Sequence, residues 1–160
     1  MRYHLSLGSN LGRKARNLER ARRLLEENGV RILRRSSLYK TEPVGLTGQP
    51  PFVNQALSVD SRMSPEALLA LLKKLEKAMK RVSGKRFGPR VIDIDILLAG
   101  RRVVASPRLR VPHPRLAERR FVLTALAEIV PKAVHPVLKK TIGNLLRETT
   151  DPSGVTKMRR

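Results

Sequence analysis

The most restrictive pattern in the sequence is a short alternation of apolar and acidic side chains. It runs Ile92, Asp93, Ile94, Asp95, Ile96. Successive side chains of a strand point to opposite faces, so the isoleucines would pack on one face of a sheet and both aspartates would lie on the other. The two carboxylates would be attached about 7 Å apart, which lets the pair hold hard cations. Alternatively, the aspartates form the solvent-facing side of a half-buried strand.

The composition predicts a single globular domain over residues 1–160. The chain is 41% hydrophobic, which is enough for a substantial core at this length. It contains no cysteine, which excludes disulfides, thiolate nucleophiles and thiolate metal sites. The longest apolar run, residues 67–72, is too short to cross a bilayer, and the first residues lack the apolar segment of a signal peptide. We therefore expect a cytoplasmic protein, a monomer rather than an oligomer, with no membrane partner.

The formal net charge of +21 predicts attraction to polyanions. Only 13 acidic residues oppose 34 lysines and arginines, and the sequence pI is about 11.7. Nucleic acid, an anionic surface and a small substrate with several negative charges all satisfy this attraction. Charge alone does not choose among them.

Apolar spacing along the chain predicts an alternation of strands and helices. A period of two predicts strands and a period near 3.6 predicts helices. The predicted order is strand 3–8, helix 13–28, strands 30–40 and 53–60, helix 65–81, strand 91–97, short strand 101–105 and helix 119–129. This order fits an α+β fold, with a ferredoxin-like split βαβ arrangement, a mainly antiparallel sheet, helices on one face, and a C-terminal extension. Residues 149–160 are expected to form a loose basic tail.

The first chemically informative cluster surrounds the aspartate pair. The cations Lys80, Arg81, Lys85, Arg86 and Arg90 lie close to it in sequence. Carboxylates surrounded by guanidinium groups suit a metal-bound polyphosphate, because Mg²⁺ bridges carboxylates to phosphate oxygens and arginines neutralise the remaining charge. Simple ion pairing between an aspartate and Arg90 is the alternative.

Two further places carry polar groups suited to binding. His113 lies between Pro112 and Pro114, which restrict the backbone and could present the ring to an anion, although a surface loop residue is the alternative. Phe52 and Asn54 follow a long loop, residues 41–51, and a ring beside an amide suits a flat heterocycle. Phe52 could instead be a core residue and Asn54 a structural one.

Taken together, these motifs resemble the 6-hydroxymethyl-7,8-dihydropterin pyrophosphokinase family, which moves a pyrophosphoryl group from ATP to a pterin alcohol in folate biosynthesis. The resemblance covers nearly the whole chain and depends on an ordered set of runs. They are LGSNLG at residues 7–12, YKTEP at 39–43, FVN at 52–54, RFGPRVIDIDIL at 86–97, VPH at 111–113 and RRFVL at 119–123.

The resemblance implies a set of roles for residues of this chain. Asp93 and Asp95 would hold two Mg²⁺ ions and act in catalysis together with Arg81 and Arg90. The residues implied in ATP binding are Glu76, Arg81, Lys85, Arg90, Ile96, Arg108, Leu109, His113 and Arg119. The residues implied in pterin binding are Thr41, Pro43, Gly45, Phe52, Asn54, Asp93 and Phe121, with the pterin between the rings of Phe52 and Phe121.

The main competing hypothesis is an RNA-binding or ribosome-associated protein, since split βαβ folds and high positive charge also serve RNA recognition. The predicted strands lack the paired aromatic residues that stack on bases, and isolated carboxylates on a strand would repel phosphate unless a cation intervened. Specific nucleic-acid binding is therefore not expected. A structural protein with unspecific charge is a third hypothesis, and it leaves the ordered motif set unexplained.

Overall fold

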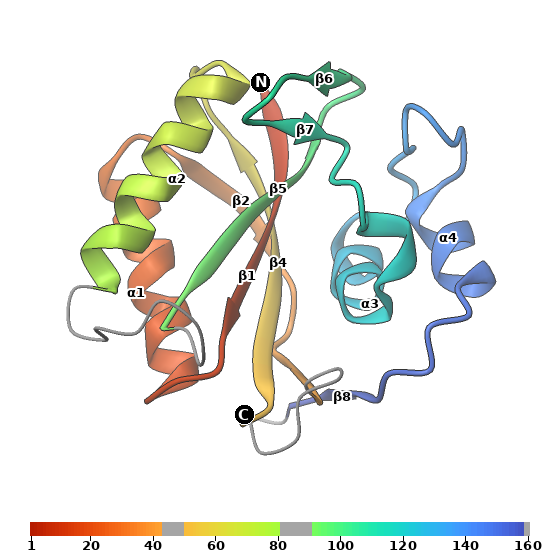
Figure 1. Cartoon of the computed structure of the whole chain (residues 1–160), viewed down its shortest axis with the longest axis horizontal. Helices are drawn as coiled ribbons and strands as arrows, with labels where there is room; N and C mark the ends of the chain where they lie inside the picture. Colours follow the sequence, from red (N-terminus) through yellow and green to blue (C-terminus); the bar gives the residue numbers. More distant parts are fainter. Residues whose placement is uncertain (43–49, 81–90, 159–160) are drawn as a thin grey trace.

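The computed structural model of the chain describes residues 1–42, 50–80 and 91–158 (Figure 1). Its centre is a six-stranded sheet in the order β5-β1-β4-β3-β8, and β2 also pairs with β4. Every strand pair in the described segments is antiparallel. The strands of this sheet are β1 (Arg2–Ser9), β2 (Arg31–Arg35), β3 (Tyr39–Thr41), β4 (Phe52–Asp60), β5 (Asp93–Ala99) and β8 (Val155–Lys157). The predicted α+β fold with a mainly antiparallel sheet is confirmed.

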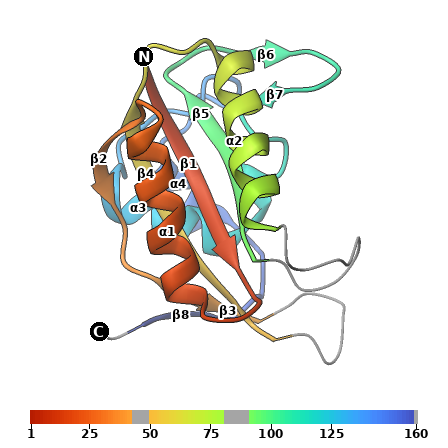
Figure 2. The ribbon, with the colours of Figure 1, turned by 90° about the vertical axis from the view of Figure 1, so that its left-hand side faces the viewer.

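Helices α1 (Lys14–Glu27) and α2 (Pro65–Met79) lie side by side on one face of the sheet (Figure 2). Leu18 and Leu25 of α1 and Leu68 and Leu72 of α2 are buried in a core formed with β1, β4 and β5. The predicted start of α2 is correct, because the Ser64 hydroxyl accepts a hydrogen bond from the Ala67 N–H. These helices form the predicted layer on one face.

The predicted strand 30–40 is two strands, β2 and β3, which pair with successive parts of β4. Ser36 lies between them and is buried. Its N–H donates to the Ala56 carbonyl and its hydroxyl accepts from the Ala56 N–H, both at 2.9 Å. A serine side chain that bonds to the neighbouring backbone competes with the regular ladder, which explains the interruption.

The C-terminal extension adds a second layer on the opposite face of the sheet (Figure 1). It contains the 3-10 helix η1 (Leu116–Glu118), α3 (Arg120–Ile129) and α4 (Ile142–Glu148), after the small β6 (Val104–Ala105) and β7 (Arg110–Val111) hairpin. The register between β1 and β5 shifts between His4 and Leu5. Leu97 and Leu98 both join the core under α3. The face of the sheet opposite α1 and α2 is thus covered over part of its area.

The predicted loose tail differs from the structure between residues 149 and 158. Val155–Lys157 forms β8, which pairs with β3 at the edge of the sheet, and the Met158 N–H donates to the Leu38 carbonyl at 2.8 Å. Charge and composition predicted fraying, but β3 offers an unpaired edge to which a short extended segment can bond. None of the helices in the described segments is long and apolar enough to cross a bilayer.

Candidate active site

A row of residues across three neighbouring strands brings the predicted metal and substrate residues together. Gly8 on β1 is opposite Asp93 on β5 and opposite Asn54 on β4. Directly opposed residues point to the same face, so Asp93 and Asn54 project on either side of a residue that has no side chain. With strands about 4.8 Å apart, the two side chains begin roughly 10 Å apart. The row therefore places a carboxylate and an amide on either side of a buried residue that has no side chain of its own.

Gly8 is required for this arrangement by its neighbours. A Cβ atom at position 8 would lie 2.8 Å from Oδ1 of Asn54 and 3.7 Å from the ring of Phe52. The first distance is below any normal contact between such atoms. Asn54 cannot move aside freely, because it is only 5% exposed and its Nδ2 donates to the Thr41 hydroxyl at 2.8 Å. The described structure thus places Thr41, Asn54 and Phe52 in one group, as predicted.

The aspartate pair lies as the alternation predicted. Ile94 and Ile96 are buried in the α1–α2 core, while Asp93 and Asp95 are half-buried on the opposite face, with Asp95 opposite Ser6. The Asp93 carboxylate is 3.3 Å from the Lys80 ammonium. The described residues contain no cluster of three or more metal-ligating side chains. Two carboxylates alone still suit Mg²⁺, which takes few protein ligands and completes its shell with phosphate and water.

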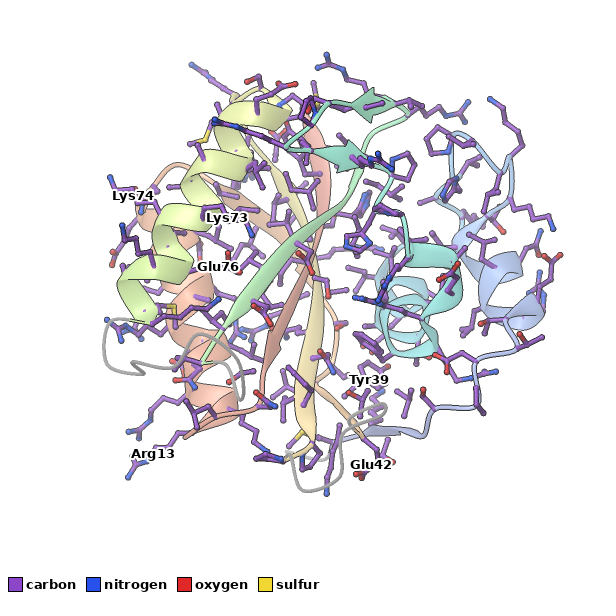
Figure 3. All side chains as sticks on the ribbon, in the orientation of Figure 1. Arg13, Tyr39, Glu42, Lys73, Lys74 and Glu76 are labelled. Atoms are coloured by element: carbon purple, nitrogen blue, oxygen red, sulfur yellow. The ribbon has the colours of Figure 1, made fainter. Side chains whose placement is uncertain are left out.

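Glu76 supports the aspartate strand from behind. It belongs to α2, on the other face of the sheet, and is 5% exposed. Its Oε2 accepts the N–H of Ile94 at 2.9 Å, and its Oε1 is 3.3 Å from the Lys73 ammonium (Figure 3). Ile94 lies between the two aspartates, so this hydrogen bond fixes the backbone that carries both. The predicted role of Glu76 in ATP binding stays a prediction.

The pKa of His113 depends on its burial and on the charged groups around it. Burial lowers the pKa of His113, the nearby Asp95 carboxylate raises it, and Arg119 and Arg115 lower it, with a net shift downward. Its Nδ1 accepts the Arg115 N–H at 3.1 Å, so the proton of the neutral ring is on Nε2. The predicted anion donor is therefore an Nε2–H group. The Val111–Pro112 peptide before it is cis.

The start of α3 carries the second aromatic residue and a cation. Arg119 precedes the helix in an extended conformation, and its guanidinium carbon is 5.9 Å from the centre of the Phe121 ring. Phe121 is half-buried and packs against the core under α3. Since α3 and the aspartates share one face of the sheet, Arg119 and Phe121 lie on the same side of the sheet as Asp93 and Asp95, and their binding roles stay predictions.

Several predicted residues lie elsewhere or outside the described part of the chain. Ile96 and Leu109 are buried in the α1–α2 core, and Arg108 is exposed just before β7. Their roles in ATP binding remain predictions. The predicted residues outside the described segments are Pro43, Gly45, Arg81, Lys85 and Arg90.

Sequence reasoning missed some residues that organise the site. Asp151 accepts a hydrogen bond from the first N–H of α3, although it lies 31 residues further along the chain. Glu128, at the other end of α3, accepts from the Tyr39 hydroxyl and from Ser37 on the adjacent sheet edge. Both contacts join segments that are distant in sequence, and no local pattern predicts them. Gly8 belonged to a recognised run, but its opposition to Asn54 depends on strand register.

Comparison with known proteins finds a matching family and related chains. The family model for 7,8-dihydro-6-hydroxymethylpterin-pyrophosphokinase (HPPK) matches residues 4–131. A relative from Methylorubrum extorquens named 2-amino-4-hydroxy-6-hydroxymethyldihydropteridine pyrophosphokinase is 41% identical over 158 residues, which cover 98% of each chain. The protein of the same name from Bacillus subtilis is 41% identical over 79% of this chain and 76% of its own length.

Other relatives are much longer than this chain. The folate synthesis bifunctional protein of Pisum sativum is 44% identical over 81% of this chain, which spans about a quarter (25%) of that relative. The HPPK-DHPS structure from Plasmodium falciparum has a TM-score of 0.75 at 19% identity and covers 92% of this chain and 45% of its own. That likeness supports the fold. With the family model matched over most of the chain, and the Methylorubrum relative over nearly its full length, this chain belongs to the HPPK family.

Proposed function

We propose that this chain transfers the pyrophosphoryl group of ATP to the hydroxymethyl group of 6-hydroxymethyl-7,8-dihydropterin and releases AMP, in folate biosynthesis. The observation that carries the proposal is the row of Asp93, Gly8 and Asn54 in a member of this family. A carboxylate for the reacting end and an amide for the heterocycle lie on either side of this glycine.

The pterin would lie over Gly8, with its edge against Asn54 and its hydroxymethyl group toward Asp93. Because Nδ2 of Asn54 donates to Thr41, its Oδ1, which lies over Gly8, is available to accept a hydrogen bond from a ring N–H. Phe52 and Phe121 offer ring faces for stacking. Pro43 and Gly45 would add backbone contacts.

ATP would approach from the side of β5 that carries His113 and Arg119. A neutral His113 donates through Nε2–H, and the Arg119 guanidinium offers a forked donor to phosphate oxygens. Arg81, Lys85, Arg90 and Arg108 would neutralise further phosphate charge, while Glu76, Ile96 and Leu109 would shape the nucleotide pocket.

The carboxylates of Asp93 and Asp95 would hold Mg²⁺, which neutralises phosphate charge and acidifies a bound alcohol when present. The reaction forms a bond between the hydroxymethyl oxygen and the β-phosphorus and breaks the bond from that phosphorus to the oxygen that leaves with AMP. The hydroxyl proton is lost. The residues of this chain therefore have to align the two substrates in line and neutralise charge, which is the main demand of such transfers.

The direct test is to incubate the purified chain with Mg²⁺, ATP and the pterin alcohol, and to identify the nucleotide released. We expect AMP, and no ADP. Asp95→Asn should lower the rate at least about a hundredfold, the effect typical of removing one charged group from a transition state. Asp60→Asn is the matched control, because Asp60 is an exposed carboxylate at the far end of β4 that pairs with the N-terminal amine.

Absence of AMP release, or an Asp95→Asn variant as active as the Asp60→Asn control, would contradict the proposal. Tight RNA binding that weakens steeply with salt would then favour the competing hypothesis. The proposed cytoplasmic location and monomeric state are tested separately, the latter by sedimentation.

A further inference from the structure

The C-terminal segment, residues 149–158, contacts both sides of the proposed pterin site. It leaves α4, passes the start of α3 and ends as β8 on the edge strand β3 (Figure 1). The start of α3 carries Arg119 and Phe121, while β3 carries Thr41, which is bonded to Asn54. This segment also lies beyond residues 4–131, the part of the chain that the family model matches.

The first contact of the segment is made at the start of α3. The residue that precedes the helix is Arg119, and its side chain makes no capping hydrogen bond. Oδ2 of Asp151 instead accepts the N–H of Arg120 at 2.8 Å, so a distant carboxylate supplies the missing cap. The Arg120 side chain donates to the backbone carbonyls of Asp151 at 2.9 Å and Thr149 at 3.2 Å. Three hydrogen bonds thus fix this end of α3 to the segment.

Asp151 is itself held in place by the turn that follows it. Its Oδ1 accepts the Ser153 N–H at 3.0 Å and the Ser153 hydroxyl at 2.6 Å. These bonds, together with the Arg120 backbone N–H, lower the pKa of the Asp151 carboxyl. The cap is therefore charged at neutral pH and has a fixed orientation.

The second contact of the segment is made along β3. Lys157, Thr156 and Val155 are opposite Tyr39, Lys40 and Thr41 respectively. Val155 and Phe121 both pack against the apolar cluster under α3. Thr41 is thus opposite a residue of β8 and at the same time accepts the hydrogen bond that orients Asn54.

The two ends of α3 are held differently. Glu128, in its last turn, bonds to Tyr39 and Ser37, so that end is fixed directly to the sheet. The first turn, next to Phe121, is held by Asp151. We infer that residues 149–158 act as a strap that sets the distance between Phe121 on α3 and the Thr41–Asn54 pair on the sheet, with Asp151 as a positioning residue for pterin binding. This inference rests on the proposed function.

The test compares point variants of the full chain. Asp151→Ala removes the cap, Asp151→Asn keeps an acceptor oxygen, and Glu148→Ala removes a nearby carboxylate that pairs only with the exposed Lys140 in the described contacts. We expect Asp151→Ala to raise the KM for the pterin about fivefold and more than it raises the KM for ATP. Asp151→Asn should stay within about twofold of the wild type, and Glu148→Ala should leave both constants unchanged.

The strap's contact with β3 is tested by Thr156→Pro. The N–H of Met158 faces β3, and N–H groups alternate along a strand, so the N–H of Thr156 faces β3 as well. Proline removes that donor and should raise the KM for the pterin, whereas Thr156→Ala keeps it and should not.

Amide hydrogen exchange gives a readout that needs no substrate. Asp151→Ala should speed exchange in the first turn of α3, and Thr156→Pro should speed it at Tyr39–Thr41. A change that only destabilised the protein would lower the folded fraction, and with it kcat, and would leave KM unaltered. That result would overturn the inference. Unchanged amide exchange in the first turn of α3 and at Tyr39–Thr41 would also overturn it. If instead Asn54→Ala and Phe121→Ala leave the KM for the pterin unchanged, the proposed pterin site is wrong, and the positioning role fails with it.

Discussion

The two faces of the central sheet are built by the same strands but differ in what they bury. The α1–α2 face is closed by apolar side chains along its length, including Leu5, Leu57 and Leu72. The opposite face carries the apolar side chains of Ala56, Leu97 and Leu98 under α3, and elsewhere it presents Asp93, Gly8 and Asn54. A period of two in a strand allows both faces to be specified at once. The difference teaches that substitutions at successive positions of one strand can alter stability and binding separately, because successive side chains lie on opposite faces.

Substitution on the closed face should have the largest effect on stability. Leu72→Ala removes a side chain that is 0% exposed, and it should lower the free energy of unfolding by about 3 kcal/mol. Chemical denaturation measures this loss. The KM values of the remaining folded enzyme should match the wild type, and a large KM change would contradict the separation of the two faces.

Glu76 is one of several buried polar residues on the closed face, where Gln55 bonds to Arg22 and Ser9 bonds to Asn17. Glu76→Leu would leave the buried N–H of Ile94 without its acceptor and should cost about 2 kcal/mol of unfolding free energy. Glu76→Gln keeps an acceptor oxygen and should retain most of that stability. The KM of Glu76→Gln for ATP then tests the predicted nucleotide role: an unchanged value would restrict Glu76 to supporting β5.

His4 is a buried titratable residue on the face of the sheet opposite α1 and α2. It lies opposite Leu98 and Ser58, is 6% exposed, and neither ring nitrogen has a hydrogen-bond partner in the described structure. Burial, with a smaller contribution from the charge of Arg2, lowers the pKa of His4 to about 4. The unfolded chain, with a pKa near 6.5, therefore binds the proton more readily than the folded chain.

Stability should consequently fall as the pH drops through this window. Between pH 7 and pH 5 the His4 contribution to the unfolding free energy should decrease by roughly 2 kcal/mol. His4→Leu cannot titrate, so the difference between variant and wild type should widen toward acid pH. Denaturation curves at several pH values measure it; parallel pH profiles would contradict the shifted pKa.

Gly8→Ala should have a specific effect on binding. The added methyl group meets Oδ1 of Asn54, which is nearly buried and bonded to Thr41, so Asn54 must shift and some stability should also be lost. We expect the KM for the pterin to rise about tenfold, equivalent to about 1.4 kcal/mol, with a smaller change for ATP. Asp60→Asn serves as the control, because Asp60 is exposed at the far end of β4, away from Gly8 and Asn54.

Much of the fold was predictable because its signals are local. The alternation around Asp93 and Asp95 predicted β5 and the shared face of the carboxylates. Ser64 predicted the start of α2 through its cap. The interruption at Ser36 and the strand at residues 155–157 were not predicted, because each depends on a partner strand rather than on neighbouring residues. The resemblance supplied the remaining site residues. The structure places Asp93, Asn54 and Phe121 on one side of the sheet, whereas Glu76, Ile96 and Leu109 lie on the α1–α2 side.

The sequence by itself determined the strand and helix periods, the aspartate pair on one strand face, and the membership in the family. The tertiary structure decided what no single segment contains. Register sets Gly8 between Asp93 and Asn54, α2 places Glu76 behind β5, and the C-terminal segment brings Asp151 to the start of α3. The physical reason is that periodicity fixes which face a side chain occupies, whereas long-range pairing fixes which other side chains share that face.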